Sequence, residues 1–116
     1  MKVLVCGGRD FTNVHLLHKT LDHLHEKYKF DILIEGDARG ADRLAGYWAK
    51  QNRIECKIFP AQWQKLGNRA GPIRNLQMLD EGKPDLVIAF PGGDGTAHMI
   101  KIARGRGIRV LEIKGE

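Results

Sequence analysis

The chain alternates short apolar runs with stretches of helical periodicity. Buried strands are predicted at five runs, residues 2–6, 32–34, 55–59, 86–90 and 108–113. In the stretches between them, apolar positions recur every three or four residues, which predicts amphipathic helices at residues 12–28, 41–51, 72–80 and 96–104. Strands that alternate with helices predict a Rossmann-like, doubly wound α/β fold with a parallel five-stranded sheet.

Two stretches in the second half of the chain carry further predictions, a long connection and the helix that follows it. Residues 60–71 follow neither period and form a connection longer than the roughly two to six residues typical of α/β units. Connections of that length are usually functional, and this one carries Trp63. In the helix that follows, Ile73, Leu76 and Leu79 form the predicted buried stripe.

The expected strand order, 3-2-1-4-5, determines where a ligand would bind. In such a sheet the winding direction changes between strands one and four, and ligands bind outside the carboxyl ends of the strands at that point. A glycine-rich turn follows each of these two strands: Gly7 and Gly8 after the first, and residues 91–96 after the fourth. We therefore expect two turns that are far apart in sequence to converge on one crevice.

The second turn has the features of a phosphate site. Its residues are Pro91, Gly92, Gly93, Asp94, Gly95 and Thr96. Glycine lets bare backbone approach a ligand, and the first turn of the following helix directs unpaired N–H groups and the positive end of its dipole into the same space. The spacing matches neither G-x-x-x-x-G-K-[ST] nor G-x-G-x-x-G. The turn by itself therefore indicates an anion without naming the ligand.

Composition limits the class of protein. A chain of 116 residues is expected to form one domain, residues 1–116. No apolar run approaches the roughly 20 residues that a membrane span needs, so we expect a cytoplasmic protein with no membrane partner. Cys6 and Cys56 lie in apolar surroundings and are expected to be buried hydrophobes without metal. The net charge of +5 favours an anionic partner, but the basic residues are dispersed and form no nucleic-acid tail.

Four motifs together resemble a known family. They are VCGGRDF at residues 5–11, GDARGADRLA at 36–45, GPIRN at 71–75 with Met78 and Leu79, and FPGGDGTA at 90–97. The series is similar to the YspA or YpsA-related branch of the SLOG superfamily and spans nearly the whole chain. The resemblance implies a Rossmann-like fold and a nucleotide-derived ligand. Its relatives include the Lonely Guy (LOG) phosphoribohydrolases, which cut the N-glycosidic bond of nucleoside monophosphates, and the DNA-processing protein DprA.

The chain departs from the LOG pattern where catalysis would occur. Arg74 matches the arginine of the RK motif, and the resemblance implies that it would be the catalytic arginine if the protein is an enzyme. The glutamate of the PGGxGTxxE motif is replaced by Met99, and the lysine after the arginine by Asn75. Cleavage through an oxocarbenium-like state needs a carboxylate, which methionine cannot supply.

Several side chains outside the glycine turns are candidate contacts. Arg9 and Arg74 are expected to contact phosphate through their guanidinium groups. Four residues follow the second strand, where an acidic residue commonly holds a ribose hydroxyl, although a helix-terminal ion pair is an equal alternative: Asp37, Arg39, Gly40 and Asp42.

The remaining candidates have weaker signals. Trp63 could stack on a base or close the edge of the core, and His98 lies in the early turns of the last helix, next to the ligand. A solvated helix face, not a metal site, is the preferred interpretation of four polar residues at helical spacing, namely His15, His18, Asp22 and His25.

We therefore predict a protein that binds a small nucleotide or nucleotide derivative, as a sensor or binding protein, without a cofactor. Two alternatives stay open: a nucleotide N-glycosidase using Asp94 or Asp10 in place of the missing glutamate, and single-stranded nucleic-acid binding of the DprA kind. LOG-like relatives are commonly dimeric, so a homodimer is a further expectation.

Overall fold

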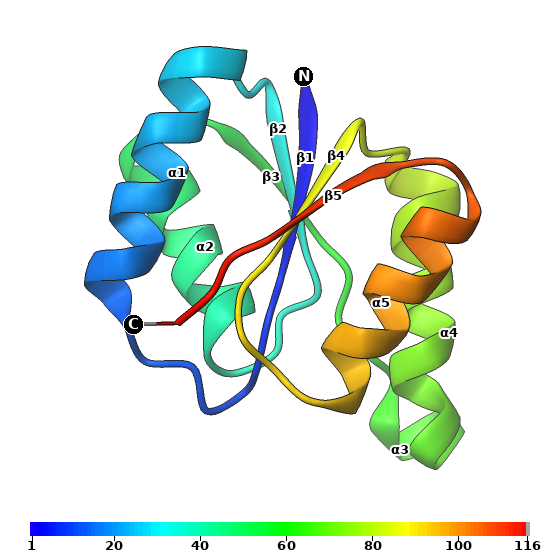
Figure 1. Cartoon of the computed structure of the whole chain (residues 1–116). Helices are drawn as coiled ribbons and strands as arrows, with labels where there is room; N and C mark the ends of the chain where they lie inside the picture. Colours follow the sequence, from blue (N-terminus) through cyan, green and yellow to red (C-terminus); the bar gives the residue numbers. More distant parts are fainter. Residues whose placement is uncertain (116) are drawn as a thin grey trace.

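The five strands form one parallel sheet, in the order β3-β2-β1-β4-β5. The computed structural model describes residues 1–115, and Figure 1 shows the sheet nearly edge-on between two layers of helices. The strands are β1 (Lys2–Cys6), β2 (Ile32–Glu35), β3 (Glu55–Ile58), β4 (Leu86–Ala89) and β5 (Arg109–Glu112). The predicted fold class and strand order are confirmed.

Two helices cover each face of the sheet (Figure 1). On one face lie α1 (Val14–Tyr28) and α2 (Ala41–Gln51). On the other lie α4 (Ala70–Gln77), extended by a π-helical segment η2 (Met78–Gly82), and α5 (Asp94–Gly105). Helix α1 begins at Val14, two residues after the start of the predicted range, and Asn13 caps it, because its side chain accepts a 3.0 Å hydrogen bond from the amide of Leu16.

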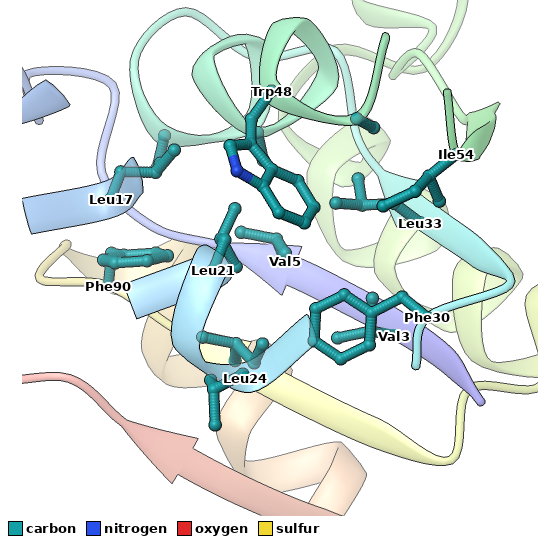
Figure 2. Packing of buried hydrophobic residues seen from close by; sticks show 14 of the residues in the cluster. Val3, Val5, Leu17, Leu21, Leu24, Phe30, Leu33, Trp48, Ile54 and Phe90 are labelled. Carbon is teal, nitrogen blue, oxygen red and sulfur yellow. The ribbon is translucent and has the colours of Figure 1, made fainter. Parts of the chain in front are cut away.

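The larger core lies beneath α1 and α2. Figure 2 shows Trp48 at its centre, against Leu33 and Val5 of the strands and Leu21 of α1. The indole N–H of Trp48 donates a 2.8 Å hydrogen bond to Asp22 Oδ1, which satisfies the one polar atom of this buried ring. This core fixes α2, and with it the end of β2, relative to β1.

The second core corrects one prediction about α4. Ile73 and Leu76 are 42% and 38% exposed, so the predicted buried stripe is wrong at these two positions, although Leu79 is buried. The buried side of the helix is rotated toward α5 and includes Ala70 and the polar Asn75. The apolar spacing was a poor guide because the buried side of α4 carries a small residue, Ala70, and a hydrogen-bonded amide, Asn75, neither of which the spacing marks as buried.

The connection over residues 60–71 is also more ordered than its sequence suggested. It contains the short helix α3 (Trp63–Leu66) and a 3₁₀ turn, η1 (Gly67–Arg69), and α4 begins at Ala70, two residues before Pro72. Helix α5 likewise begins earlier than expected, at Asp94. Among residues 1–115, no helix combines the length and apolar character needed to cross a membrane.

Candidate functional site

The two glycine-rich turns touch each other at the carboxyl edge of the sheet. The amide of Gly8 donates a 2.9 Å hydrogen bond to the carbonyl of Pro91. A side chain at Gly8 would put its Cβ 3.1 Å from Gly92 Cα, and one at Gly92 would put its Cβ 2.7 Å from the Gly8 nitrogen. Gly92 therefore requires glycine for the fold itself, and a side chain at Gly8 would force the two backbones slightly apart.

A cleft of about 1070 Å³ opens beside these turns. Four segments supply most of its lining: the end of β1 with the loop that follows, the start of α2, the stretch from α3 into α4, and the turn that leads into α5. In Figure 1 the loops after β1 and β4 lie together at the bottom of the molecule, with α3 on the right-hand side of the same end. The cleft is thus at the switch point of the sheet, where a ligand is expected in this fold.

The start of α5 offers the cleft a set of backbone amides. Gly93 precedes the helix and has no side chain to cap it, and the Ala97 amide is bonded to the Gly93 carbonyl at 3.0 Å. Among residues 1–115, the amides of Asp94, Gly95 and Thr96 have no hydrogen-bond acceptor. Such amides, together with the positive end of the helix dipole, favour an anion.

The glycines of this turn serve two different purposes. Gly92 is packed against Thr96 and Gly8, so it is needed for the turn to form. Gly93 and Gly95 both line the cleft, and a Cβ at either would meet no heavy atom within 4 Å. Gly93 also has a negative φ of −104°, so the protein itself does not demand glycine there. Open space next to bare amides is what a bound group would occupy.

Arg74 lies at the side of the cleft near β2 and is half-buried. Its Nη1 donates to the carbonyl of Gly36, and its Nε donates to Asn75 Oδ1 at 3.1 Å. Burial lowers the pKa of Arg74, and the nearby carboxylate of Asp42 opposes that shift. Two of its donors fix the guanidinium in place, so the predicted phosphate contact starts from a preorganised group.

Asn75 is a site residue that the sequence interpretation missed. It is 4% exposed, and its Nδ2 lies 3.2 Å from the carbonyl of Gly95 and 3.1 Å from Nδ1 of His98. Because a carbonyl only accepts, the amide nitrogen must face Gly95, and Nδ1 of His98 must then accept and carry no proton. His98 therefore holds its proton on Nε2, and Asn75 ties α4 to the first turn of α5.

Arg9 and Trp63 meet across the mouth of the cleft. The Arg9 guanidinium carbon lies 4.8 Å from the centre of the Trp63 ring, a cation–π distance. Trp63 is 44% exposed and lines the cleft, so it does not close the core. Arg39 supports this loop from outside, since its Nε donates to the Arg9 carbonyl at 3.2 Å and its Nη2 pairs with Asp10 at 2.9 Å.

The carboxylates after β2 are arranged differently from the sequence expectation. Asp37 has a left-handed φ of 57° and pairs with Arg43 at 3.3 Å, and neither Asp37 nor Arg39 lines the cleft. Asp42 does line it, and it is only 5% exposed. Burial raises the pKa of Asp42 to about 6, against the opposing effects of Arg74 and the loop amides. The ligand roles of Asp37 and Arg39 stay predictions.

Three further residues bear on the chemistry. Met99, at the position of the LOG glutamate, is fully buried in the core beneath α5. Cys6 lines the cleft, but burial raises the pKa of its thiol far above the ordinary value, so it is not a thiolate nucleophile. Cys56 is half-buried.

Among residues 1–115, no three histidine, cysteine or acidic side chains are grouped to hold a metal ion. Two members of the polar face on α1 have structural partners instead. His25 Nδ1 accepts a 3.0 Å hydrogen bond from the Phe30 amide, and Asp22 is bonded to Trp48.

Comparisons with known proteins identify relatives of this chain. A family model for the YspA, cpYpsA-related SLOG family matches residues 1–66. The Gene 61 protein of Mycobacterium phage D29 is 34% identical over 118 residues, which cover 95% of this chain and 94% of that protein. The chain belongs to the YspA, cpYpsA-related SLOG family. The predicted resemblance is therefore confirmed.

The family model covers only part of the residues that line the cleft. Residues 1–66 of this SLOG domain include the Gly7-Gly8 turn, Asp42 and Trp63, whereas Arg74 and the turn into α5 lie beyond them. No solved structure matches the chain. The cleft is thus built from both the matched part and the part that follows it.

Proposed function

We propose that this SLOG domain binds a small nucleotide or nucleotide derivative, with a phosphate on the turn into α5. The observation that carries the proposal is the set of amides of Asp94, Gly95 and Thr96, which face an open cleft and have no acceptor among residues 1–115. Family membership supports a nucleotide-related ligand. Arg74 and Arg9 add positive charge to the same cleft, and Trp63 offers an aromatic face for a base.

The dimensions of the cleft favour a small molecule over a polymer. About 1070 Å³ between two loops and a short helix is of the size that holds a nucleotide-sized ligand. A strand of nucleic acid would instead need a continuous basic groove. We propose that a mononucleotide would compete fully with an oligonucleotide for the protein.

Binding is favoured over N-glycosidic hydrolysis because neither of the two carboxylates that could replace the LOG glutamate is in a buried site suited to acid–base catalysis. Asp10 is almost fully exposed and paired with Arg39, and Asp94 is exposed in the first turn of α5. Met99 contributes no acid. Chromatography of nucleotides incubated with the protein tests the hydrolase alternative, which requires release of free base.

The test of binding is isothermal titration with AMP, ADP-ribose, NAD and cyclic nucleotides. A Gly93→Ala variant should keep its stability and lose about tenfold or more in affinity, because the added methyl group occupies the open space beside the amides and keeps the phosphate from reaching them. Gly105→Ala is the matched control, since Gly105 also has open space around it but lies at the other end of α5. Absence of binding to all of these ligands would refute the proposal.

A further inference from the structure

Asp42 is a buried carboxylate that faces the cleft with part of its acceptor capacity unused. It is 5% exposed, and its carboxylate accepts hydrogen bonds from two backbone amides, that of Ala38, at 3.3 Å to Oδ2, and that of Gly36. An ionised carboxylate can accept about four. Buried polar groups normally complete their hydrogen bonds, so the side chain is suited to a donor brought by a ligand.

Arg74 lies beside this carboxylate but forms no ion pair with it. A Cβ on Gly36 would be 2.9 Å from Asp42 Oδ2 and 2.8 Å from Arg74 Cζ, so the two side chains flank the same glycine. In the described chain no nitrogen of Arg74 is within 4.0 Å of a carboxylate oxygen. The guanidinium favours the ionised form of Asp42 and leaves its oxygens available.

No other carboxylate in this region has these properties. Glu35 is buried but does not line the cleft, and Asp37 is paired with Arg43 outside it. Asp10 and Asp94 line the cleft but are exposed. An uncharged donor suits Asp42 best, because a phosphate would be repelled by the carboxylate and an ammonium group by the neighbouring Arg74 and Arg9.

The position of Asp42 relative to the α5 amides indicates which donor. The start of α2 lies over the end of β1, since the Ala41 amide bonds to the Gly8 carbonyl at 3.2 Å, and the Gly8 amide bonds to Pro91 of the turn into α5 at 2.9 Å. Asp42 and the α5 amides therefore line the same cleft next to the Gly8 turn. A ribose 5-phosphate with its phosphate on the amides would extend its sugar hydroxyls along this turn toward Asp42.

We propose that Asp42 is the ribose subsite of this cleft, and that its carboxylate accepts hydrogen bonds from the 2′- and 3′-hydroxyls of a bound ribonucleotide. The inference rests on the proposed function and narrows it, because it makes ribonucleotides the ligand class and excludes deoxyribonucleotides. It also assigns to Asp42 alone the role that the sequence pattern offered to both Asp37 and Asp42.

The experiment compares the four ribonucleoside monophosphates with their 2′,3′-dideoxy counterparts by isothermal titration at pH 8. Comparison within each pair cancels the unknown contribution of the base. The wild-type protein should bind the ribonucleotide about tenfold or more tightly, since a hydrogen bond to a charged group has that effect. Asp42→Asn should reduce the ratio to below about threefold, with the affinity for the dideoxy compound nearly unchanged. Asp37→Asn is the control and should keep the wild-type ratio.

The outcomes separate this inference from the broader proposal. Equal binding of both members of a pair by the wild-type protein would overturn the ribose subsite and leave nucleotide binding intact. A ratio that persists in Asp42→Asn would overturn the assignment to Asp42. No binding of any monophosphate would overturn the ribose subsite, and the titrations with ADP-ribose, NAD and cyclic nucleotides would then decide the broader proposal. Comparison of ribonucleotides with dideoxynucleotides on the wild-type protein tests the ribose subsite even if the Asp42→Asn variant does not fold.

Discussion

Asn75 Nδ2 donates a 3.2 Å hydrogen bond to the carbonyl of Gly95 and thereby joins helix α4 to the first turn of α5. The same side chain accepts from Arg74 Nε at 3.1 Å. One buried amide thus holds the arginine and the amide-bearing turn in fixed positions on two sides of the cleft. Asn75 therefore positions both groups that would hold a phosphate, the Arg74 guanidinium and the backbone amides at the start of α5.

Removing this link should cost stability. Asn75→Ala leaves the Nε–H of Arg74 and the ring of His98 without a buried partner, so the free energy of unfolding should fall by about 2 kcal/mol. Urea denaturation followed by circular dichroism measures this. Asn68→Ala is the control, because Asn68 also lines the cleft but is exposed, and its change should be within about 0.5 kcal/mol. Equal effects of the two substitutions would contradict the structural role of Asn75.

The turn into α5 predicts opposite behaviour for two adjacent glycines. Gly92→Ala places a methyl group 2.7 Å from the Gly8 nitrogen and against Thr96, so it should destabilise the fold, by roughly 1–3 kcal/mol. Gly93→Ala meets no protein atom and should leave the melting temperature within a few degrees of wild type. Thermal unfolding of the two variants measures the difference. A strong loss of stability in Gly93→Ala would show that this part of the turn is not open.

These glycines also illustrate what sequence could predict. Apolar periodicity predicts the alternation of strands and helices, and the order 3-2-1-4-5 is one of the common orders for such a parallel sheet. The convergence of the Gly7-Gly8 turn with the later turn follows from that order. Both features depend on the backbone, which residue type and spacing largely determine. The predicted element boundaries accordingly differ from the observed ones by about two residues or fewer.

The directions of individual side chains could not be predicted in the same way. Asp37 and Asp42 are the same residue type and only five positions apart. The left-handed backbone at Asp37 nevertheless directs its side chain to Arg43, while the side chain of Asp42 lines the cleft. In α4, Ile73 points outward and Asn75 inward, against their polarity. In each case a local turn or a tertiary hydrogen bond outweighs the average preference of the residue type.

The two tryptophans allow ligand binding at the mouth of the cleft to be observed directly. Trp48 is 1% exposed in the core, whereas Trp63 is 44% exposed under the guanidinium of Arg9. A nucleotide base that stacks on Trp63 should quench its emission. We expect nucleotide titration to lower the fluorescence of the wild-type protein and not that of Trp63→Phe excited at 295 nm. A response that survives in Trp63→Phe would contradict base stacking at this residue.

Glu35 should make the protein more stable in mild acid than at neutral pH. It is 2% exposed, and burial raises its pKa from the ordinary 4.5 to about 7, against the hydrogen bond from the Asp37 amide. Between these two values the folded state binds more protons than the unfolded state, so the free energy of unfolding rises as the pH falls from about 7 to about 4.5. Asp42 contributes in the same direction below about pH 6.

Glu35→Gln isolates the contribution of this carboxyl. The amide can still accept from Asp37 but carries no charge, so the variant should be more stable than wild type at pH 8 by about 2 kcal/mol. At pH 4.5 the advantage should nearly disappear, because the wild-type carboxyl is then protonated in the fold. Urea denaturation at both values measures the two differences, with Glu55→Gln, an exposed residue of β3, as the control. A difference between Glu35→Gln and wild type that does not change with pH would contradict the raised pKa and leave only a packing effect of the substitution.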